Sequence, residues 1–228
     1  MKYNHIKEAV FLNRPNRFIA NIIVDGKEEV SHVKNTGRCA ELLTNHAQIY
    51  VQEHDDAKRK TKFSLIAVNK AGTLINMDSQ APNQVVKEWL FAGGLFPDVT
   101  LVKPETKYMD SRFDFYVETP TKKVFIEVKC VTLEVDGIAR FPDAPTSRGV
   151  KHIEELCQSV KEGYEAYIIF VIQMKGIIQF EPNYMRQEEF GFALEAARDQ
   201  GVHILAYDCI VTQDTLVLDQ EVPVKLGV

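Results

Sequence analysis

The sequence lacks the features that would place it in a membrane or in an oxidising compartment. Its longest apolar run, residues 166–172, is far shorter than the roughly 20 residues that a transmembrane helix needs. The N-terminus has no apolar run of the signal-peptide kind. The four cysteines, Cys39, Cys130, Cys157 and Cys209, are scattered, and no two have zinc-ligand spacing. We therefore predict a cytoplasmic protein that has reduced thiols and no membrane partner.

An excess of positive charge is also missing, because 27 Lys and Arg stand against 32 Asp and Glu, a net charge of -5. This balance excludes a protein that coats nucleic acid over its whole surface. The charge is nevertheless uneven along the chain. Residues 1–80 hold 12 basic and 9 acidic side chains, a net charge of +3, so the remaining residues carry -8. We therefore expect the affinity for nucleic acid to reside largely in the N-terminal part.

Two basic groups stand out in that part. One comprises Lys58, Arg59, Lys60 and Lys62, and the other comprises Arg14, Arg17, Lys34 and Arg38. For any single one of these residues, a solvated surface charge is the simpler interpretation.

Short β-prone segments separated by turns dominate the first 80 residues. We predict strands over 17–24, 28–34, 47–53, 63–68 and 73–77, with Asp25-Gly26 as the two-residue turn of a hairpin. Five short strands in a basic module favour a small OB-like β-barrel, a fold that binds single strands or oligosaccharides. The first predicted domain is thus residues 1–80.

Alternating strands and helices follow in the second predicted domain, residues 81–228. A helix over 79–94 marks the boundary. Beyond it we predict these elements: a strand over 124–133, a helix over 150–162, a strand over 166–174, a helix over 184–200 and a strand over 202–211. The pattern predicts a mixed sheet flanked by helices, so the whole chain is a two-domain α+β and α/β protein.

The most informative stretch is a predicted hairpin between residues 111–117 and 124–129. If Val117 faces Val124, then Asp114 lies opposite Glu127, with their side-chain bases roughly 5 Å apart, and Lys129 shares their face. The same register gathers large apolar side chains on the other face: Phe113, Phe115, Ile126 and Val128.

Two facing carboxylates repel each other unless a cation bridges them or one is protonated. A site with oxygen ligands and no cysteine or histidine on its face suits Mg²⁺, with Mn²⁺ as a substitute. Asp114 and Glu127 would hold the ion with the Val128 carbonyl, and Lys129 would stabilise the transition state of phosphodiester cleavage. The competing interpretation is an ordinary Glu127–Lys129 charge pair on a half-exposed strand.

Several supporting residues complete the predicted site. Glu105 is the preferred further metal ligand, with Glu88 on the boundary helix as the alternative. Positive side chains at the start of the helix after the Glu127 strand suit a phosphate. The predicted nucleic-acid contacts are Arg17, Arg38, Lys58, Arg59, Lys60, Arg112, Arg148, Lys151 and His152.

An Asp, a hairpin and then Glu-x-Lys resemble the PD-(D/E)xK nuclease superfamily, in which the acids hold the metal and the Lys assists the attacking water. Over nearly its whole length the chain also resembles the sugar fermentation stimulation protein family. The matching segments are 35–38, 58–60, 111–115, 127–129 with 132–133, and 141–144 continuing through Thr146, Arg148, Gly149, Lys151 and His152 to Leu156. Two departures are Met109-Asp110, where a glycine is usual, and Cys39, where methionine is usual.

This resemblance implies an N-terminal OB-like domain, a C-terminal nuclease-like domain and DNA binding linked to the regulation of sugar metabolism. The leading hypothesis is a Mg²⁺-dependent nuclease. The alternatives are a non-catalytic DNA-binding regulator that keeps the nuclease fold, and a barrel that binds sugars. The sequence does not distinguish DNA from RNA as the nucleic acid that is bound, and it does not indicate an oligomeric state.

Overall fold

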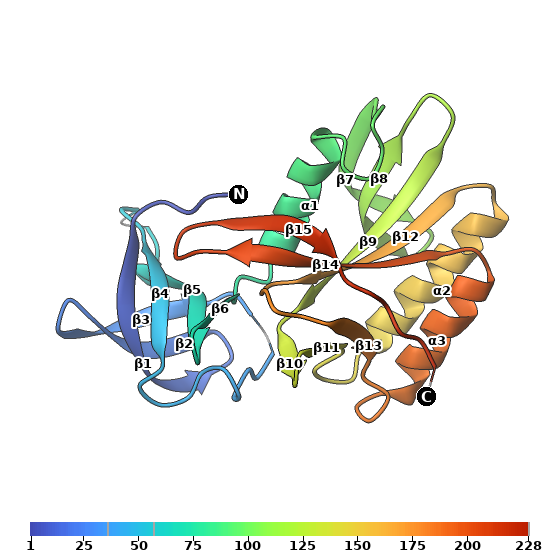
Figure 1. Cartoon of the computed structure of the whole chain (residues 1–228). Helices are drawn as coiled ribbons and strands as arrows, with labels where there is room; N and C mark the ends of the chain where they lie inside the picture. Colours follow the sequence, from blue (N-terminus) through green and yellow to red (C-terminus); the bar gives the residue numbers. More distant parts are fainter. Residues whose placement is uncertain (36, 57, 228) are drawn as a thin grey trace.

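The N-terminal strands form a barrel in the computed structural model, which describes residues 1–35, 37–56 and 58–227. Thr36, part of one segment that carries the family resemblance, lies outside the described residues. The barrel strands are β1 (Ile6–Asn16), β2 (Ile19–Val24), β3 (Lys27–Val33), β4 (Gln48–Glu53), β5 (Phe63–Lys70) and β6 (Thr73–Asn76). Figure 1 shows them on the left of the molecule.

The barrel strands have the order β3-β2-β1-β4-β5-β6. The barrel closes because β3, at one end of this order, also pairs with β5, next to the other end. The predicted β2–β3 hairpin is confirmed, with Val24 opposite Lys27. Its two turn residues, Asp25 and Gly26, both have positive φ, as a type I′ turn requires. The OB-like barrel predicted from the sequence is therefore correct, although β1 was missed.

The C-terminal part is a mixed sheet with helices, as predicted. Its sheet has the order β15-β14-β12-β9-β8-β7, and a small second sheet has the order β10-β11-β13. The strands are β7 (Leu101–Tyr108), β8 (Ser111–Glu118), β9 (Lys123–Val131), β10 (Leu133–Val135), β11 (Ile138–Phe141), β12 (Glu165–Ile172), β13 (Gln179–Pro182), β14 (His203–Val211) and β15 (Leu216–Glu221). The helices are α1 (Ala81–Phe91), α2 (Ser147–Lys161) and α3 (Glu188–Asp199).

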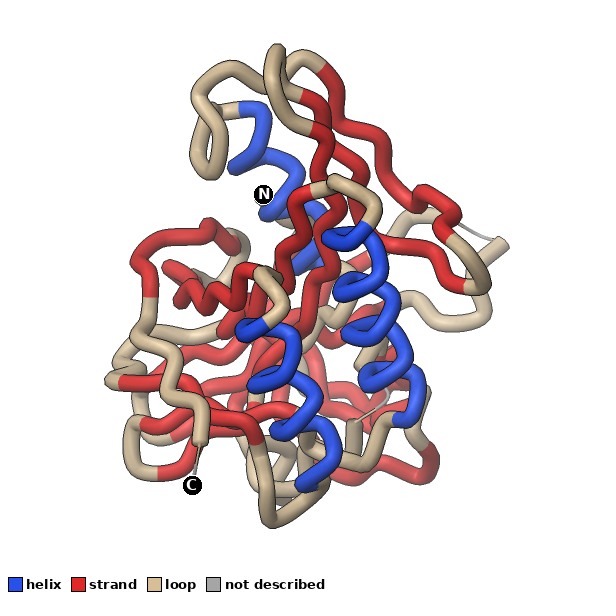
Figure 2. Tube along the Cα trace, turned by 90° about the vertical axis from the view of Figure 1, so that its right-hand side faces the viewer, coloured by secondary structure: helices blue, strands red, loops and turns tan. Residues whose placement is uncertain are grey.

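Parallel pairing places β12 between β9 and β14, and this explains the apolar run of β12. A central strand that is covered on both faces has no polar side to present, so residues 166–172 are all buried. Figure 2 shows α2 and α3 lying side by side along the sheet, while α1 lies apart from them. The hydroxyl of Thr146 caps α2 by accepting a hydrogen bond from the Gly149 N–H at 2.9 Å.

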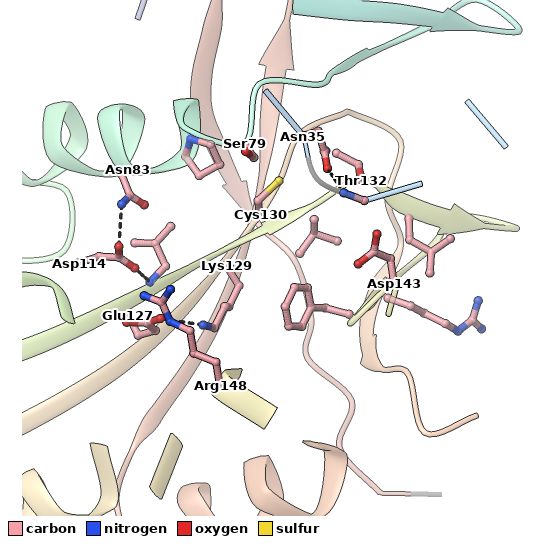
Figure 3. Close-up of a pocket in the computed structure, with 17 residues that line it drawn as sticks. Asn35, Ser79, Asn83, Asp114, Glu127, Lys129, Cys130, Thr132, Asp143 and Arg148 are labelled. Atoms are coloured by element: carbon pink, nitrogen blue, oxygen red, sulfur yellow. Dashed lines mark hydrogen bonds and ion pairs between the residues drawn. The ribbon is translucent and has the colours of Figure 1, made fainter. Parts of the chain in front are cut away.

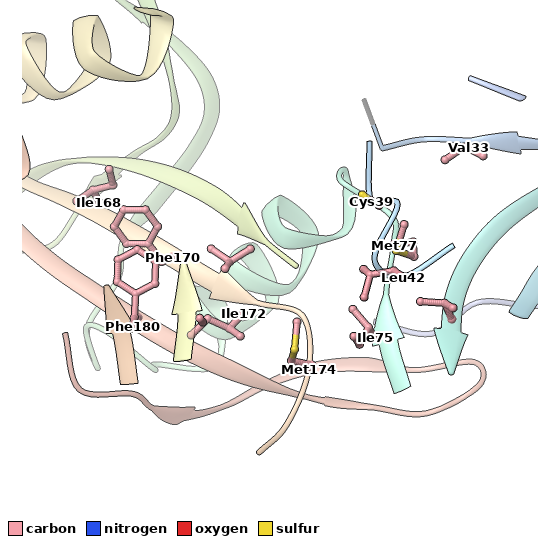
Figure 4. Close-up of a cluster of buried hydrophobic side chains, with 14 of the residues drawn as sticks. Val33, Cys39, Leu42, Ile75, Met77, Ile168, Phe170, Ile172, Met174 and Phe180 are labelled. Atoms are coloured by element: carbon pink, nitrogen blue, oxygen red, sulfur yellow. The ribbon is translucent and has the colours of Figure 1, made fainter. Parts of the chain in front are cut away.

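One hydrophobic core runs from the barrel into the side of the sheet that α2 and α3 cover. It includes Ile75 and Met77 from the barrel end together with Ile172 and Met174 from the end of β12 (Figure 4). Polar contacts cross the same junction, because the Gln173 amide donates to the Asn76 side chain at 2.7 Å. The division of the chain at residues 80 and 81 stays a prediction.

The sequence predicted reduced cysteine thiols and no membrane partner. None of the helices in the described part of the chain has both the length and the apolar character needed to cross a membrane. All four cysteines are free thiols, and Cys39, Cys157 and Cys209 are buried.

Candidate metal centre

The hairpin that carries the candidate site has the predicted register at its outer end. Val117 faces Val124 and Phe115 faces Ile126. At the next position the Asp114 carboxylate enters the strand interface, where its Oδ2 accepts a hydrogen bond from the Val128 backbone N–H at 2.7 Å. The β9 backbone thus donates to the Asp114 side chain at a position where it would otherwise pair with the β8 backbone.

Phe113 does not pack where the hairpin pattern predicted. It stacks near Tyr108 and lies 5.2 Å from the ring of Phe125, in the core beneath α2. Phe115 and Val128 pack in the core on the α1 side of the sheet. The single apolar face that the hairpin pattern predicted is therefore wrong at Phe113. The β8–β9 pairing ends at Phe115 and Ile126, so Phe113 lies beyond the paired part of the hairpin.

Asp114 is held by two neutral donors. Besides the Val128 amide, the Asn83 side chain from α1 donates to Oδ1 at 2.7 Å. Burial and the nearby negative charge of Glu127 together raise the pKa of Asp114 to about 6, against the lowering effect of these hydrogen bonds. Asp114 and Glu127 are thus close enough to repel, as the hairpin predicts.

Glu127 is the most deeply buried acid of the site, at 4% exposure. Its Oε1 lies 2.7 Å from the Lys129 Nζ and 2.5 Å from the His152 Nδ1. Burial acts to raise the pKa of Glu127, but the His152 hydrogen bond and the Lys129 charge outweigh it and hold this pKa below its ordinary value. The second oxygen, Oε2, is buried and has no hydrogen-bond partner among the described residues.

Both carboxylates open into a pocket of about 430 Å³, called here the central pocket (Figure 3). Its walls come from both parts of the chain. The loop after β3 contributes Asn35 and Gly37, α1 contributes Asn83, and α2 contributes Arg148. The floor is formed by the β9 segment from Glu127 to Val131. A substrate in this pocket would touch the barrel and the sheet at once.

The donor set fits a hard divalent cation. A buried carboxylate oxygen without a partner costs free energy unless an ion or a water satisfies it, and Glu127 Oε2 is such an atom. Asp114 offers further carboxylate oxygens, and its negative charge is disfavoured there by burial and by the nearby charge of Glu127. No set of three His, Cys, Asp or Glu side chains gathers as a metal site within residues 1–35, 37–56 and 58–227. Asp114 and Glu127 are therefore the two carboxylates that this part of the structure offers to a cation.

The predicted additional acids lie away from this pair. The Glu105 side chain is 65% exposed and forms an ion pair with Arg112 at 3.3 Å. Glu88 on α1 pairs with the N-terminal ammonium at 2.7 Å. The structure does not bring either carboxylate to the Asp114–Glu127 pair.

A second depression, called here the outer groove, lies between the β7–β8 hairpin and α2. It meets the central pocket at Asp114 and Arg148, which line both. Its exposed basic side chains are Lys107, Arg112, Arg148 and Lys151. Three of these four were predicted as nucleic-acid contacts, and the structure places them along one path to the acids.

His152 corrects the prediction made for it. This residue is 3% exposed, and both of its ring nitrogens already have partners, Glu127 and Arg148. It has no free donor for a phosphate. Sequence reasoning missed this role, although its position on α2, one helical turn after Arg148, was the available signal. It missed Asn83 entirely, because a lone Asn in a helix has no distinctive pattern.

The barrel holds the other predicted nucleic-acid contacts. Arg17 and Arg38 are exposed and line a groove of about 580 Å³, called here the barrel groove. Lys58, Arg59 and Lys60 are exposed in the loop between β4 and β5. Within this loop the Arg59 guanidinium donates to the Ser64 hydroxyl at 3.1 Å.

Arg14 differs from its basic neighbours. Its guanidinium donates to the backbone carbonyls of Gly37, Arg38, Arg17 and Asn35 at 2.5 to 2.8 Å. Three of these bonds tie the end of β1 to the loop after β3, and the fourth, to Arg17, holds the turn between β1 and β2. Arg14 is therefore a structural residue in this groove, and it has little capacity left for a phosphate.

Comparison with known protein families agrees with this two-part architecture. A family model described as "SfsA N-terminal OB domain" matches residues 12–77, and one described as "Sugar fermentation stimulation protein RE domain" matches residues 80–215. A Clostridium beijerinckii protein named "Sugar fermentation stimulation protein homolog" is 59% identical over 99% of this chain and 100% of that protein. A protein of the same name from Ruminiclostridium cellulolyticum is 56% identical over the same shares.

Among solved structures, the fold is similar to that described as "The structure of Pyrococcus Furiosus SfsA in complex with Ca2+". The TM-score is 0.87 at 24% sequence identity, and the match covers 99% of this chain and 98% of the other. At this identity the similarity establishes the shared fold.

Proposed function

The chain belongs to the sugar fermentation stimulation protein family, and we propose that it binds DNA and hydrolyses phosphodiester bonds with a divalent cation held by Asp114 and Glu127. Mg²⁺ is the proposed ion, and Mn²⁺ is a substitute with the same ligand preference. A cytoplasmic location and a link to sugar metabolism, as the family's name suggests, belong to this proposal.

The observation that carries the proposal is the state of Glu127. One of its oxygens is held by two donors, while the other is buried without a partner beside a second, repelled carboxylate. In an ordinary charge pair on a half-exposed strand, the carboxylate would be solvated, and a neighbouring acid would be unnecessary. The arrangement leaves oxygen ligands for a cation at the bottom of a pocket. The related Pyrococcus furiosus structure is described as a complex with Ca²⁺, which supports a divalent ion in this family.

The residues of the chain have separate tasks in the proposed reaction. Glu127 Oε2, Asp114 and the Val128 carbonyl would hold the cation, which would polarise the phosphodiester and activate water for attack. Lys129 is 13% exposed and places its ammonium at the pocket floor. There it stabilises the negative charge that develops on the phosphoryl oxygens as water attacks phosphorus and the bond to the leaving oxygen breaks.

Nucleic acid is the proposed substrate because basic side chains lie along both approaches to the acids. The outer groove supplies Arg112, Arg148 and Lys151 on the sheet side, and the barrel supplies Arg17 and Arg38. Such charges bind the phosphate backbone without reading sequence. A nucleic-acid backbone that follows the outer groove would reach Asp114, which lines both that groove and the central pocket.

A non-catalytic DNA-binding regulator is the second candidate. The observation in its favour is the number of acids, because only two carboxylates meet in the described part of the site. The basic surfaces would then serve binding alone.

The deciding experiment incubates the purified protein with labelled single- and double-stranded DNA and RNA, in Mg²⁺, Mn²⁺ or EDTA. We expect cleavage in Mg²⁺ or Mn²⁺, none in EDTA, and none with Glu127→Gln. The matched control is Glu165→Gln, which removes a half-buried acid that pairs with Lys122 on the same sheet. If no nucleic acid is cut under any condition while DNA is still bound, the regulator replaces the nuclease.

A further inference from the structure

A chain of hydrogen bonds connects the protein surface to the buried acid of the candidate site. The Arg148 Nε donates to the His152 Nε2 at 3.2 Å, and the His152 Nδ1 lies 2.5 Å from the Glu127 Oε1. Arg148 and His152 lie one turn apart on α2, and Glu127 lies on β9 beneath them. The Arg148 side chain, at the outer end of these hydrogen bonds, is exposed, whereas His152 and Glu127 are buried.

The donors on each side fix the proton on the histidine. An arginine side chain has only N–H donors, so the His152 Nε2 facing Arg148 must be the acceptor. The Nδ1 side of the ring then faces Glu127 as the donor. Arg148 thus fixes the orientation of the His152 ring, and His152 orients a carboxylate in the way that outer partners orient metal ligands.

This hydrogen bond decides which Glu127 oxygen faces the cation. His152 and Lys129 both occupy Oε1, and Oε2 is left without a partner in the part of the chain that the structure describes. Without the histidine the carboxylate could rotate and present either oxygen to Lys129. The histidine thus contributes to the geometry of the ion site without touching the ion.

Arg148 is placed to sense a substrate phosphate. It lines both the central pocket and the outer groove, and in Figure 3 it extends from α2 toward the Glu127–Lys129 pair. Its Nε is used by His152, while no hydrogen bond within the described residues uses its two terminal nitrogens. Those nitrogens can form a bidentate contact with a phosphate.

We propose that Arg148 and His152 are positioning residues that couple phosphate binding to the orientation of the metal ligand Glu127. The inference rests on the proposed function, since it concerns the same site. A phosphate that fixes the Arg148 guanidinium also fixes its Nε–H on His152, and hence the carboxylate. By thermodynamic reciprocity, nucleic acid then raises the affinity for the cation, and the cation raises the affinity for nucleic acid by the same factor.

Two variants of His152 distinguish its hydrogen bond to Glu127, the inner link, from its hydrogen bond to Arg148, the outer link. In His152→Asn the amide nitrogen can stand where Nδ1 stood and still donate to Glu127, but nothing reaches Arg148. In His152→Leu both links are removed. Arg148→Ala removes only the outer link. The control is Lys161→Ala, because Lys161 is an exposed cation in the last turn of the same helix and lines neither the central pocket nor the outer groove.

The measurement is Ca²⁺ affinity by calorimetric titration of the full chain, with and without a saturating single-stranded or duplex DNA oligonucleotide. For His152→Leu we expect Ca²⁺ affinity about 10- to 100-fold weaker than wild type, as for the loss of an outer partner of a metal ligand. His152→Asn should recover most of this loss. The increase in Ca²⁺ affinity caused by DNA should persist in Lys161→Ala and disappear in His152→Asn and Arg148→Ala. Melting in EDTA identifies any variant that fails to fold.

The outcomes separate this inference from the proposed function. If wild type takes up no Ca²⁺, the cation site and the proposed function fail together. If wild type binds Ca²⁺ and His152→Leu binds it equally well, the positioning role alone is wrong. If Arg148→Ala retains the full effect of DNA on Ca²⁺ affinity, the coupling through Arg148 is wrong.

Discussion

The Val128 backbone N–H donates to the Oδ2 of Asp114 across the β8–β9 hairpin at 2.7 Å. The Asp114 carboxylate thus accepts the hydrogen bond at the point where the β8–β9 pairing ends. This hydrogen bond fixes the position of Asp114 before any ligand arrives, although the carboxylate is unfavourably charged there. The free-energy cost of that charge can be measured.

Asp114→Asn should stabilise the ion-free protein at neutral pH. The folded pKa of about 6 lies above the ordinary value of 3.8. Between these values the folded state binds more protons than the unfolded state, so wild-type stability falls as pH rises from about 4 to about 6. The variant should therefore be more stable than wild type at pH 7 by on the order of 1 to 2 kcal/mol, allowing for partial solvent screening.

Urea unfolding in EDTA at pH 4 and pH 7 checks this prediction. The gain should shrink toward pH 4, and Ca²⁺ should raise the melting temperature of wild type only. Asp143→Asn is the control, because Asp143 is an exposed acid of the same pocket. An Asp114→Asn protein that is equally destabilised at both pH values would contradict the assignment.

Lys129→Met should slow Mg²⁺-dependent cleavage by about 10² to 10³, the usual loss when one preorganised charge-stabilising group is removed. DNA affinity should change much less, because the ammonium lies at the pocket floor instead of along the basic grooves. Single-turnover cleavage and DNA titration in Ca²⁺ distinguish the two effects. Lys122→Met, in which a surface cation is removed, is the control. Equal losses in binding and cleavage would show that Lys129 acts on the bound substrate.

Arg17→Ala combined with Arg38→Ala should weaken DNA binding and flatten its dependence on salt. Each phosphate that the protein no longer neutralises removes about one unit from the slope of log affinity against log salt concentration. Fluorescence anisotropy at several salt concentrations measures both quantities. Arg198→Ala is the control, because this exposed arginine on α3 lines neither the barrel groove nor the outer groove. An unchanged slope in the double variant would move the DNA-binding surface away from the barrel groove.

Arg14→Met should behave differently from the Arg17 variant, although both arginines line the barrel groove. It removes a charged donor from four carbonyls, so we expect a loss of about 2 to 3 kcal/mol in the free energy of unfolding. Chemical denaturation gives this value directly. Normal stability with weakened DNA binding would instead make Arg14 a phosphate ligand.

The sequence predicted elements where a single pattern dominates. The apolar run of β12 and the Asp25-Gly26 turn are such cases. The strand β1 was missed because the adjacent charged residues Lys7 and Glu8 interrupt the apolar pattern at its start, and its burial alternates only in part. Short edge strands such as β13 were missed because their pairing depends on segments distant in sequence.

The site was predictable as far as the hairpin register reaches. The sequence predicted that Asp114, Glu127 and Lys129 would come together, and all three line the central pocket. The roles of Asn83 and His152 could not be predicted, because each depends on how a helix packs onto that hairpin. Arg148 was predicted as a phosphate contact from its place in α2, but its hydrogen bond to His152 requires side-chain geometry.

The core shared by the barrel and the sheet has a consequence for cooperativity. Met77 and Met174 are both almost completely buried in it. Separation of the chain at residue 80 would therefore expose apolar surface on both fragments. We therefore expect the two parts of the chain to unfold together, and a calorimeter should record one heat-absorption peak for the whole chain. An isolated barrel fragment would be a poor proxy for the barrel in the intact protein.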